Sequence, residues 1–126
     1  MTTFDPPEPA LEAGWLIEGT DGDSQSLRLS FGETELSRAY LGRVVGRHPA
    51  LCDRVIADPT VSRRHFRLGL ANGSLFVEDL NSLNGTFVDG VEAPPFQPVP
   101  LKPGQVLSLG RVRLIVAAVA VRGPTK

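Results

Sequence analysis

Short apolar runs alternate with turn-forming residues along the chain, and this pattern predicts a protein built from β-strands. Within 66–71, apolar Phe66, Leu68 and Leu70 alternate with small or charged residues, the period of two that a half-buried strand shows. From Trp15 onward such runs are separated by Gly, Pro, Asn and Asp. The predicted strands are 15–18, 26–30, 40–45, 54–57, 65–71, 74–78, 86–88, 99–101, 106–109 and 112–121.

Two dipeptides between these runs predict tight hairpins. Asn72-Gly73 and Asp89-Gly90 are pairs that tolerate positive φ, as the preferred two-residue hairpin turns require. No segment shows the 3.6-residue apolar period of an amphipathic helix. Eleven prolines and 13 glycines, spread between short strands, therefore favour an all-β fold of the β-sandwich class.

The length of 126 residues predicts one domain with terminal tails. Residues 1–13 combine three prolines with acidic side chains, which predicts a flexible N-terminal tail. The folded domain is expected over 14–121, with a short C-terminal tail at 122–126.

Charge is distributed unevenly along the chain, although the formal net charge is only -1. Residues 1–37 hold eight acidic side chains and one arginine, whereas residues 38–67 hold seven arginines and two acids. The basic stretch indicates an anionic partner. The sequence pI of about 6.1 argues against nucleic acid, whose binding domains are usually strongly basic.

Other compositional features indicate a cytoplasmic protein. Cys52 is the single cysteine, so no intrachain disulfide and no thiolate metal cluster can form. The first residues lack the basic and apolar layout of a signal peptide. The longest apolar run, 114–121, is far shorter than the roughly 20 residues that span a bilayer, so no membrane insertion is expected. Eleven arginines against two lysines suggest a GC-rich, bacterial genome.

Three clusters at the ends of strand-like runs carry the side chains best suited to binding. Arg47 has a planar guanidinium that can give paired hydrogen bonds to phosphate oxygens. Ser62 can donate its hydroxyl, and Asn84 offers donors and an acceptor to an extended peptide. The clusters are Gly46-Arg47, Ser62-Arg63-Arg64-His65 and Asn81-Ser82-Leu83-Asn84-Gly85-Thr86.

These elements, in this order and spacing, resemble the forkhead-associated (FHA) domain, a module that recognises phosphothreonine peptides. The matching segments are SRRHFRL and VEDLNSLNGTFVDG, with the Gly46-Arg47 pair before them, and the likeness covers roughly 14–121. It implies a β-sandwich of about eleven strands, of the SMAD/FHA type, with the ligand bound on loops at one end. It also implies a role in Ser/Thr kinase signalling, with a phosphorylated protein, such as a kinase or its substrate, as partner.

The resemblance assigns roles to individual residues. Arg47 and Ser62 would contact the phosphate, with Arg63 reaching the phosphate or the peptide, and Asn84 would hold the peptide main chain. Gly46, His65 and Gly85 would support the loops. Leu83 departs from the family, which often has Thr or Ser there, so one hydroxyl contact is missing.

Alternatives from other functional classes are weaker. If a strand has begun by Ser62, then Ser62 and His65 point to opposite faces and cannot form a catalytic pair. No Gly-x-Ser-x-Gly elbow, phosphate-binding Gly-Lys loop or metal-ligand spacing is present, so no enzyme, no cofactor and no metal are expected. The remaining rival is a structural or docking β-sandwich that does not depend on phosphate.

The N-terminal tail itself could supply a ligand. Thr2 and Thr3 carry phosphorylatable hydroxyls, and Asp5 stands three places after Thr2, a position that FHA domains read. A phosphorylated tail would then occupy the basic site of its own or of a neighbouring molecule.

Overall fold

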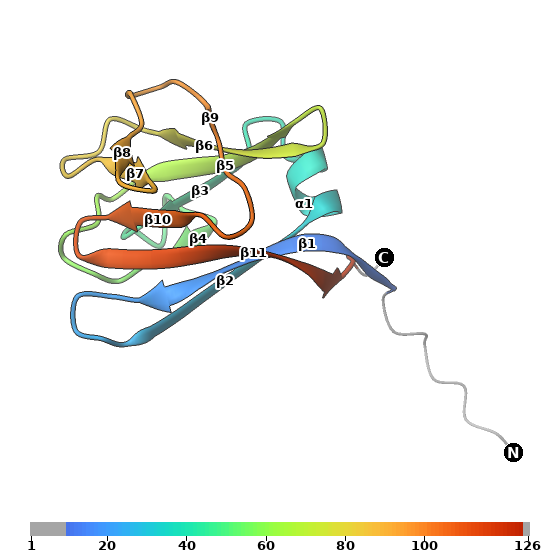
Figure 1. Ribbon diagram of the computed structural model, residues 1–126, viewed down its shortest axis with the longest axis horizontal. Helices are drawn as coiled ribbons and strands as arrows, with labels where there is room; N and C mark the ends of the chain where they lie inside the picture. The colour runs from blue at the N-terminus through green and yellow to red at the C-terminus, as the bar shows by residue number, and fades with distance from the viewer. Residues whose placement is uncertain (1–9, 125–126) are drawn as a thin grey trace, which may run out of the picture.

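Two β-sheets are stacked on each other in the computed structural model, which describes residues 10–124 (Figure 1). The chain enters at one end of the sandwich along β1 and crosses to the other end, where most of the connecting loops lie. The strands are β1 Leu11–Thr20, β2 Ser26–Gly32, β3 Arg43–Gly46, β4 Arg54–Val55, β5 Phe66–Ala71, β6 Ser74–Asp79, β7 Thr86–Val88, β8 Val91–Glu92, β9 Val99–Pro100, β10 Val106–Leu109 and β11 Val112–Arg122, and one helix, α1 Glu33–Arg38, follows β2.

The strand order explains how distant segments meet. One sheet has the order β2-β1-β11-β10-β7-β8, and the other has the order β4-β3-β5-β6-β9. All neighbouring strands are antiparallel except β3 and β4. The long β1–β11 pairing, from Leu11 opposite Arg122 to Thr20 opposite Arg113, joins the two ends of the domain.

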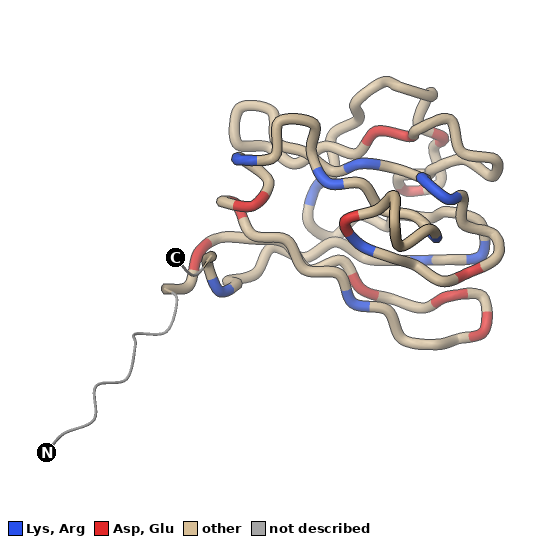
Figure 2. Tube along the Cα trace, turned by 180° about the vertical axis from the view of Figure 1, so that it is seen from behind, with Lys and Arg blue, Asp and Glu red and all other residues tan. Residues whose placement is uncertain are grey.

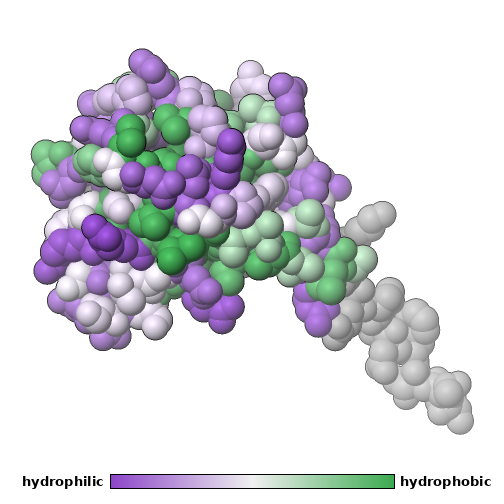
Figure 3. All heavy atoms as spheres, viewed as in Figure 1, coloured by the Kyte–Doolittle hydropathy of each residue, from purple (hydrophilic) through white to green (hydrophobic). Residues whose placement is uncertain are grey.

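Alternation along the strands fills the space between the sheets. On β11, Val112, Leu114 and Val116 are buried, whereas Arg113 and Ile115 face outward. Buried side chains from both sheets, from α1 and from the loops form a single apolar core, which includes Ile17, Phe31, Leu36, Val45, Ile56, Phe66, Leu68, Val77, Leu101, Leu107 and Leu109. The outer surface over β11 and β1 is also partly apolar, as Figure 3 shows, and Ile115 there is 54% exposed.

The predicted fold class is confirmed, and so are the hairpins. Each of the ten predicted strands overlaps a strand of the structure. The turn residues Asn72 and Gly73 have φ of 53° and 79°, and Asp89 and Gly90 have φ of 49° and 80°, as two-residue turns of this class require.

Two elements were not predicted. The expectation of no helix is wrong at α1, a six-residue helix that buries only Leu36 and has no side-chain cap at Gly32. Six residues make fewer than two helical turns, which is too few for an apolar stripe to recur along the sequence. The two-residue strand β8 was also missed, because both of its residues are exposed and it shows no alternation.

The expected domain boundaries, at residues 13 and 121, fall within two strands of the structure. β1 begins at Leu11, inside the tail predicted over 1–13, and β11 extends to Arg122. These ends pair with each other, and the Gly123 N–H donates to the Ala10 carbonyl over 2.9 Å. The expectation for Thr2, Thr3 and Asp5 falls outside the described residues. Within residues 10–124, no helix is long and apolar enough to cross a membrane.

Candidate functional site

A single hollow at the loop end of the sandwich brings the predicted binding residues together. Residues from the end of β3 onward, from the β4–β5 loop and from the β6–β7 loop line it. They are Arg47, which directly follows β3, and Pro59, Thr60, Val61, Ser62, Arg63, Arg64, Asn81, Leu83 and Asn84. All five predicted phosphopeptide-binding residues are in this set. Figure 2 shows several Lys and Arg positions at the end of the sandwich farthest from the N-terminus, with Asp and Glu positions among them.

Gly46 allows β3 to lie directly against the β4–β5 loop. A Cβ atom at this position would lie 2.3 Å from the Arg63 carbonyl oxygen and 2.9 Å from that of Ser62. The next two residues continue the contact, because Arg47 N–H donates to the Ser62 carbonyl (3.0 Å) and His48 N–H donates to that of Arg63 (3.2 Å). Any larger residue at Gly46 would separate Arg47 from Ser62.

The Arg47 guanidinium is anchored at one nitrogen and open at the others. Its Nε–H donates to the Val61 carbonyl over 3.0 Å, which fixes the plane of the group at the edge of the hollow. The side chain is otherwise exposed. The terminal nitrogens therefore remain able to give a paired hydrogen bond to an anion.

Ser62 connects the two loops through its hydroxyl. Its Oγ accepts a hydrogen bond from the Leu83 main-chain N–H over 3.0 Å. The hydroxyl hydrogen is not used in that bond and can be donated to a ligand. Leu83 thus contributes its main chain to the site, while its side chain is 90% exposed at the rim.

Asn84 is oriented by the opposite loop. Its Nδ2 donates to the Thr60 carbonyl over 2.8 Å. The second N–H of the amide and its Oδ1 remain for a ligand.

His65 is buried beneath the site and holds both loops. Its Nδ1 accepts from the Ser62 main-chain N–H (3.0 Å), so its Nε2 carries the hydrogen and donates to the Gly85 carbonyl (2.9 Å). Burial lowers the pKa of His65, although the Gly85 carbonyl and the Asp79 carboxylate act in the opposite direction. A neutral imidazole with both nitrogens engaged cannot act as a base toward a substrate.

The premise that kept Ser62 and His65 apart is wrong. β5 begins at Phe66, so residues 62–65 form a loop in which the His65 ring lies against the Ser62 main chain. The ring contacts the Ser62 N–H and not its hydroxyl, which is bonded to Leu83. The arrangement is therefore a support for the loop and lacks the hydroxyl–imidazole hydrogen bond of a nucleophilic pair.

Several residues at the site had been given no individual role from the sequence. Arg64, Thr60 and Asn81 line the hollow, and Asp79, which is 2% exposed, organises the β6–β7 loop. Asp79 accepts hydrogen bonds from the Ser82 hydroxyl (2.5 Å) and N–H (3.1 Å) and from the Thr86 hydroxyl (2.7 Å). Asp79 is the last residue of β6, and a polar residue that ends an apolar strand is the signal that could have indicated this role.

The charges around the hollow favour an anion. Arg47, Arg63 and Arg64 border it, and across residues 10–124 no carboxylate lies within ion-pairing distance of these three side chains. Within the same residues, no group of three His, Cys, Asp or Glu side chains could hold a metal ion. The site can therefore offer guanidinium, hydroxyl and amide donors to a ligand with several oxygens.

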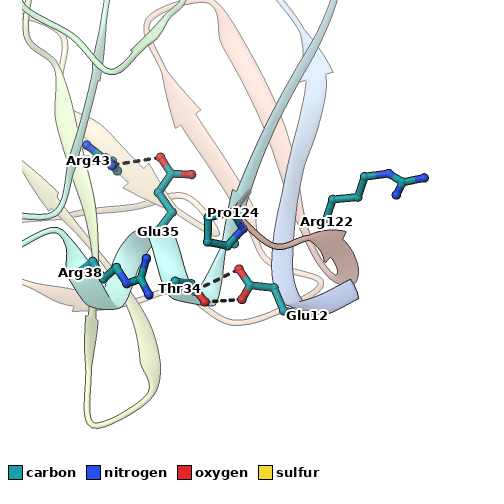
Figure 4. Close-up of a pocket in the computed structure, with 8 residues that line it drawn as sticks. Glu12, Thr34, Glu35, Arg38, Arg43, Arg122 and Pro124 are labelled. Atoms are coloured by element: carbon teal, nitrogen blue, oxygen red, sulfur yellow. Dashed lines mark hydrogen bonds and ion pairs between the residues drawn. The ribbon is translucent and has the colours of Figure 1, made fainter. Parts of the chain in front are cut away.

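A second hollow lies at the other end of the sandwich, where β1 begins (Figure 4). Its carboxylates are already engaged within the protein. Glu35 pairs with Arg43 (2.9 Å) and Arg54 (2.7 Å), and Glu12 accepts from the Thr34 hydroxyl and N–H. Unlike the first hollow, this one is lined by carboxylates as well as arginines, so it is the less favourable of the two for an anionic ligand.

Comparisons with known proteins agree on one family. The family model described as "FHA domain" matches residues 43–110. Glycogen accumulation regulator GarA of Mycobacterium tuberculosis is 35% identical over 102 residues, covering 79% of this chain and 60% of GarA. The oxoglutarate dehydrogenase inhibitor of Corynebacterium efficiens is 38% identical over 73 residues, covering 58% and 49%. The chain thus spans about three fifths or less of the length of these relatives.

A solved structure supports the same assignment. It is described as a structural and functional analysis of phosphothreonine-dependent FHA domain interactions. It superposes with a TM-score of 0.60 at 28% identity, over 82% of this chain and 95% of the other.

Proposed function

Because this chain belongs to the FHA domain family, whose members bind phosphothreonine, we propose that it is a phosphothreonine-dependent protein–protein interaction module. The observation that carries the proposal is the convergence of Arg47, Ser62 and Asn84, from three separate segments, on one hollow that no acidic side chain lines. A phosphothreonine brings about -1.5 to -2 charges and three acceptor oxygens to such a site.

Each residue has a proposed part in binding. The open nitrogens of Arg47 and the hydroxyl hydrogen of Ser62 bind phosphate oxygens, with Arg63 beside them. The remaining donor and acceptor of Asn84 bind the peptide main chain. His65, Gly46 and Gly85 support these groups without touching the ligand. His65 is fully buried, Gly46 lies against the main chain of the β4–β5 loop, and the Gly85 carbonyl accepts from His65.

The partner is proposed to be a phosphorylated protein in a Ser/Thr kinase pathway, either a kinase or its substrate. The names of the relatives, a regulator and an inhibitor, support a module that acts by binding and not by catalysis. The engaged ring nitrogens of His65 support the same conclusion, because they leave the hollow without a general base.

The proposal is tested by titrating a phosphothreonine peptide and its unphosphorylated twin into the protein. Binding near micromolar, about -8 kcal/mol, is expected for the phosphorylated peptide only. Arg47→Ala should weaken binding by about 2–5 kcal/mol, because the dianion loses its main partner but is still desolvated. Arg113→Ala is the matched control, since Arg113 is exposed on β11 outside the hollow.

Two outcomes would contradict the proposal. An Arg47→Ala variant that binds as tightly as the wild type would remove Arg47 from the site. Equal affinity for the two peptides would favour the alternative, a β-sandwich that docks proteins without regard to phosphate.

A further inference from the structure

We infer that Thr60, held in place by the buried carboxylate of Asp58, is a positioning residue that orients the Asn84 amide toward the peptide. The inference rests on the proposed function and adds to it a coupling between the β4–β5 and β6–β7 loops. It follows from a continuous series of hydrogen bonds that begins beneath the site and ends at a group lining the hollow.

The series begins at Asp58, which is 1% exposed. Its carboxylate accepts hydrogen bonds from the Thr60 hydroxyl (2.6 Å), the Thr60 N–H (2.8 Å) and the Gly22 N–H (2.8 Å). Burial alone would raise the pKa of Asp58, but these donors, together with nearby Arg111, outweigh it and leave the pKa below its ordinary value. Asp58 therefore stays ionised and fixes Thr60 through two bonds.

Residues of the β10–β11 turn also hold Thr60 in place. Its Oγ accepts a hydrogen bond from the Arg111 main-chain N–H over 2.9 Å. Gly110, at φ +57°, lies so close that a Cβ atom there would be 2.2 Å from the Thr60 Oγ and 2.7 Å from its carbonyl oxygen. Contacts from the Asp58 carboxylate and from the β10–β11 turn thus determine where the Thr60 carbonyl points.

That carbonyl determines the orientation of Asn84. Because a carbonyl oxygen only accepts, the Asn84 group facing it at 2.8 Å is the N–H and not the Oδ1. The second N–H and the Oδ1 are then presented together, the donor and acceptor that an extended peptide main chain requires. A Thr60 carbonyl that could move would allow the amide to rotate and lose this match.

Three substitutions separate positioning from general stability. Thr60→Val removes the hydroxyl at nearly constant volume, and Thr60→Ser restores it. Thr34→Val is the matched control, because the Thr34 hydroxyl also donates to a carboxylate, that of Glu12, but at the far end of the sandwich (Figure 4).

The first test is the affinity for a phosphothreonine peptide. We expect Thr60→Val to weaken binding about tenfold, the order of one hydrogen bond, and Thr60→Ser to recover most of it. Thr34→Val should bind as the wild type does. In an Asn84→Ala background, Thr60→Val should cost less than about twofold, because the group it positions is absent. An equal loss with and without the Asn84 side chain would overturn the inference.

The second test needs no ligand. The NMR signals of the Asn84 side-chain amide should shift in Thr60→Val and in Asp58→Asn, but not in Thr34→Val. Unchanged signals in folded Thr60→Val or Asp58→Asn protein would overturn the inference. If the wild type binds neither peptide, the proposed function fails, and the amide signals still decide whether Thr60 positions Asn84.

Discussion

Individual residues at the site differ in whether their polar atoms remain available to a ligand. Arg47 uses one nitrogen within the protein and Ser62 uses one lone pair, so each retains a donor. His65 uses both ring nitrogens and is fully buried. The first two therefore suit recognition of an anion, whereas His65 can only stabilise the loops that carry them.

The environment of His65 predicts that stability falls in mild acid. Burial holds its folded pKa below the ordinary value of about 6.5, so the unfolded chain binds a proton more readily than the folded one. The free energy of unfolding should be constant above about pH 6.5 and should decrease as the pH falls from there to the folded pKa. Urea unfolding between pH 7.5 and 5.5 measures the slope.

Urea unfolding of the His48→Gln variant tests whether His65 causes the pH dependence of the unfolding free energy. His48 is partly exposed and lies outside the buried cluster, so the variant should retain the dependence on pH. Carboxyl groups ordinarily have pKa values near 4, so they do not titrate in this window. A wild-type unfolding free energy that is flat from pH 7.5 to 5.5 would contradict the prediction.

The sequence indicated the candidate binding side chains better than it indicated the groups that hold them in place. Arg47, Ser62 and Asn84 stand in recognisable order, and the structure brings them to one hollow. The carbonyl groups of Val61 and Thr60, which hold Arg47 and Asn84, belong to the main chain and leave no trace in residue type. Their role depends on how two loops approach in three dimensions.

Among the elements, the paired ends of β1 and β11 belong to the folded domain. A chain that begins at Gly14 loses the pairs from Leu11 to Ala13 with Ala120 to Arg122, and it loses the bonds between Glu12 and Thr34. We expect a loss of about 2 kcal/mol in unfolding free energy, since each hydrogen bond contributes about 1 kcal/mol and these residues are half exposed.

A chain that begins at Ala10 is the matched comparison, because it keeps every interaction described above. Thermal unfolding of the two truncated chains should show the lower melting temperature only for the one that starts at Gly14. Equal melting temperatures would support a tail that ends at residue 13, as the proline and acid content predicted.

Elements with strong alternation were predictable, and elements set by tertiary contacts were not. The ten predicted strands include every strand with at least three residues. Helix α1 depends instead on burial of Leu36 and on the pairing of Glu35 with Arg43 and Arg54, partners that come from later strands. Contacts of this kind leave no periodic pattern of apolar residues in the local sequence, so the helix could not be predicted from it.

At the scale of the whole molecule, β1 separates the hollow lined by Arg47, Ser62 and Asn84 from the start of the described chain. Its first residues border the hollow of Figure 4, and its last residues lead to Gly22, which binds Asp58 beneath the site. A strand of 10 residues is about 33 Å long. A ligand carried on the N-terminal tail must cover that length to reach the site of its own molecule.

This geometry predicts that a phosphorylated tail binds between molecules. From Thr2 to Ala10 the chain can span at most about 29 Å when fully extended, less than the length of β1 alone. Phosphorylation at Thr2 should therefore produce association that depends on concentration, which sedimentation velocity can measure, and Arg47→Ala should abolish it. A phosphorylated chain that stays monomeric at every concentration, while NMR shifts at Ser62 report an occupied site, would show closure within one molecule instead.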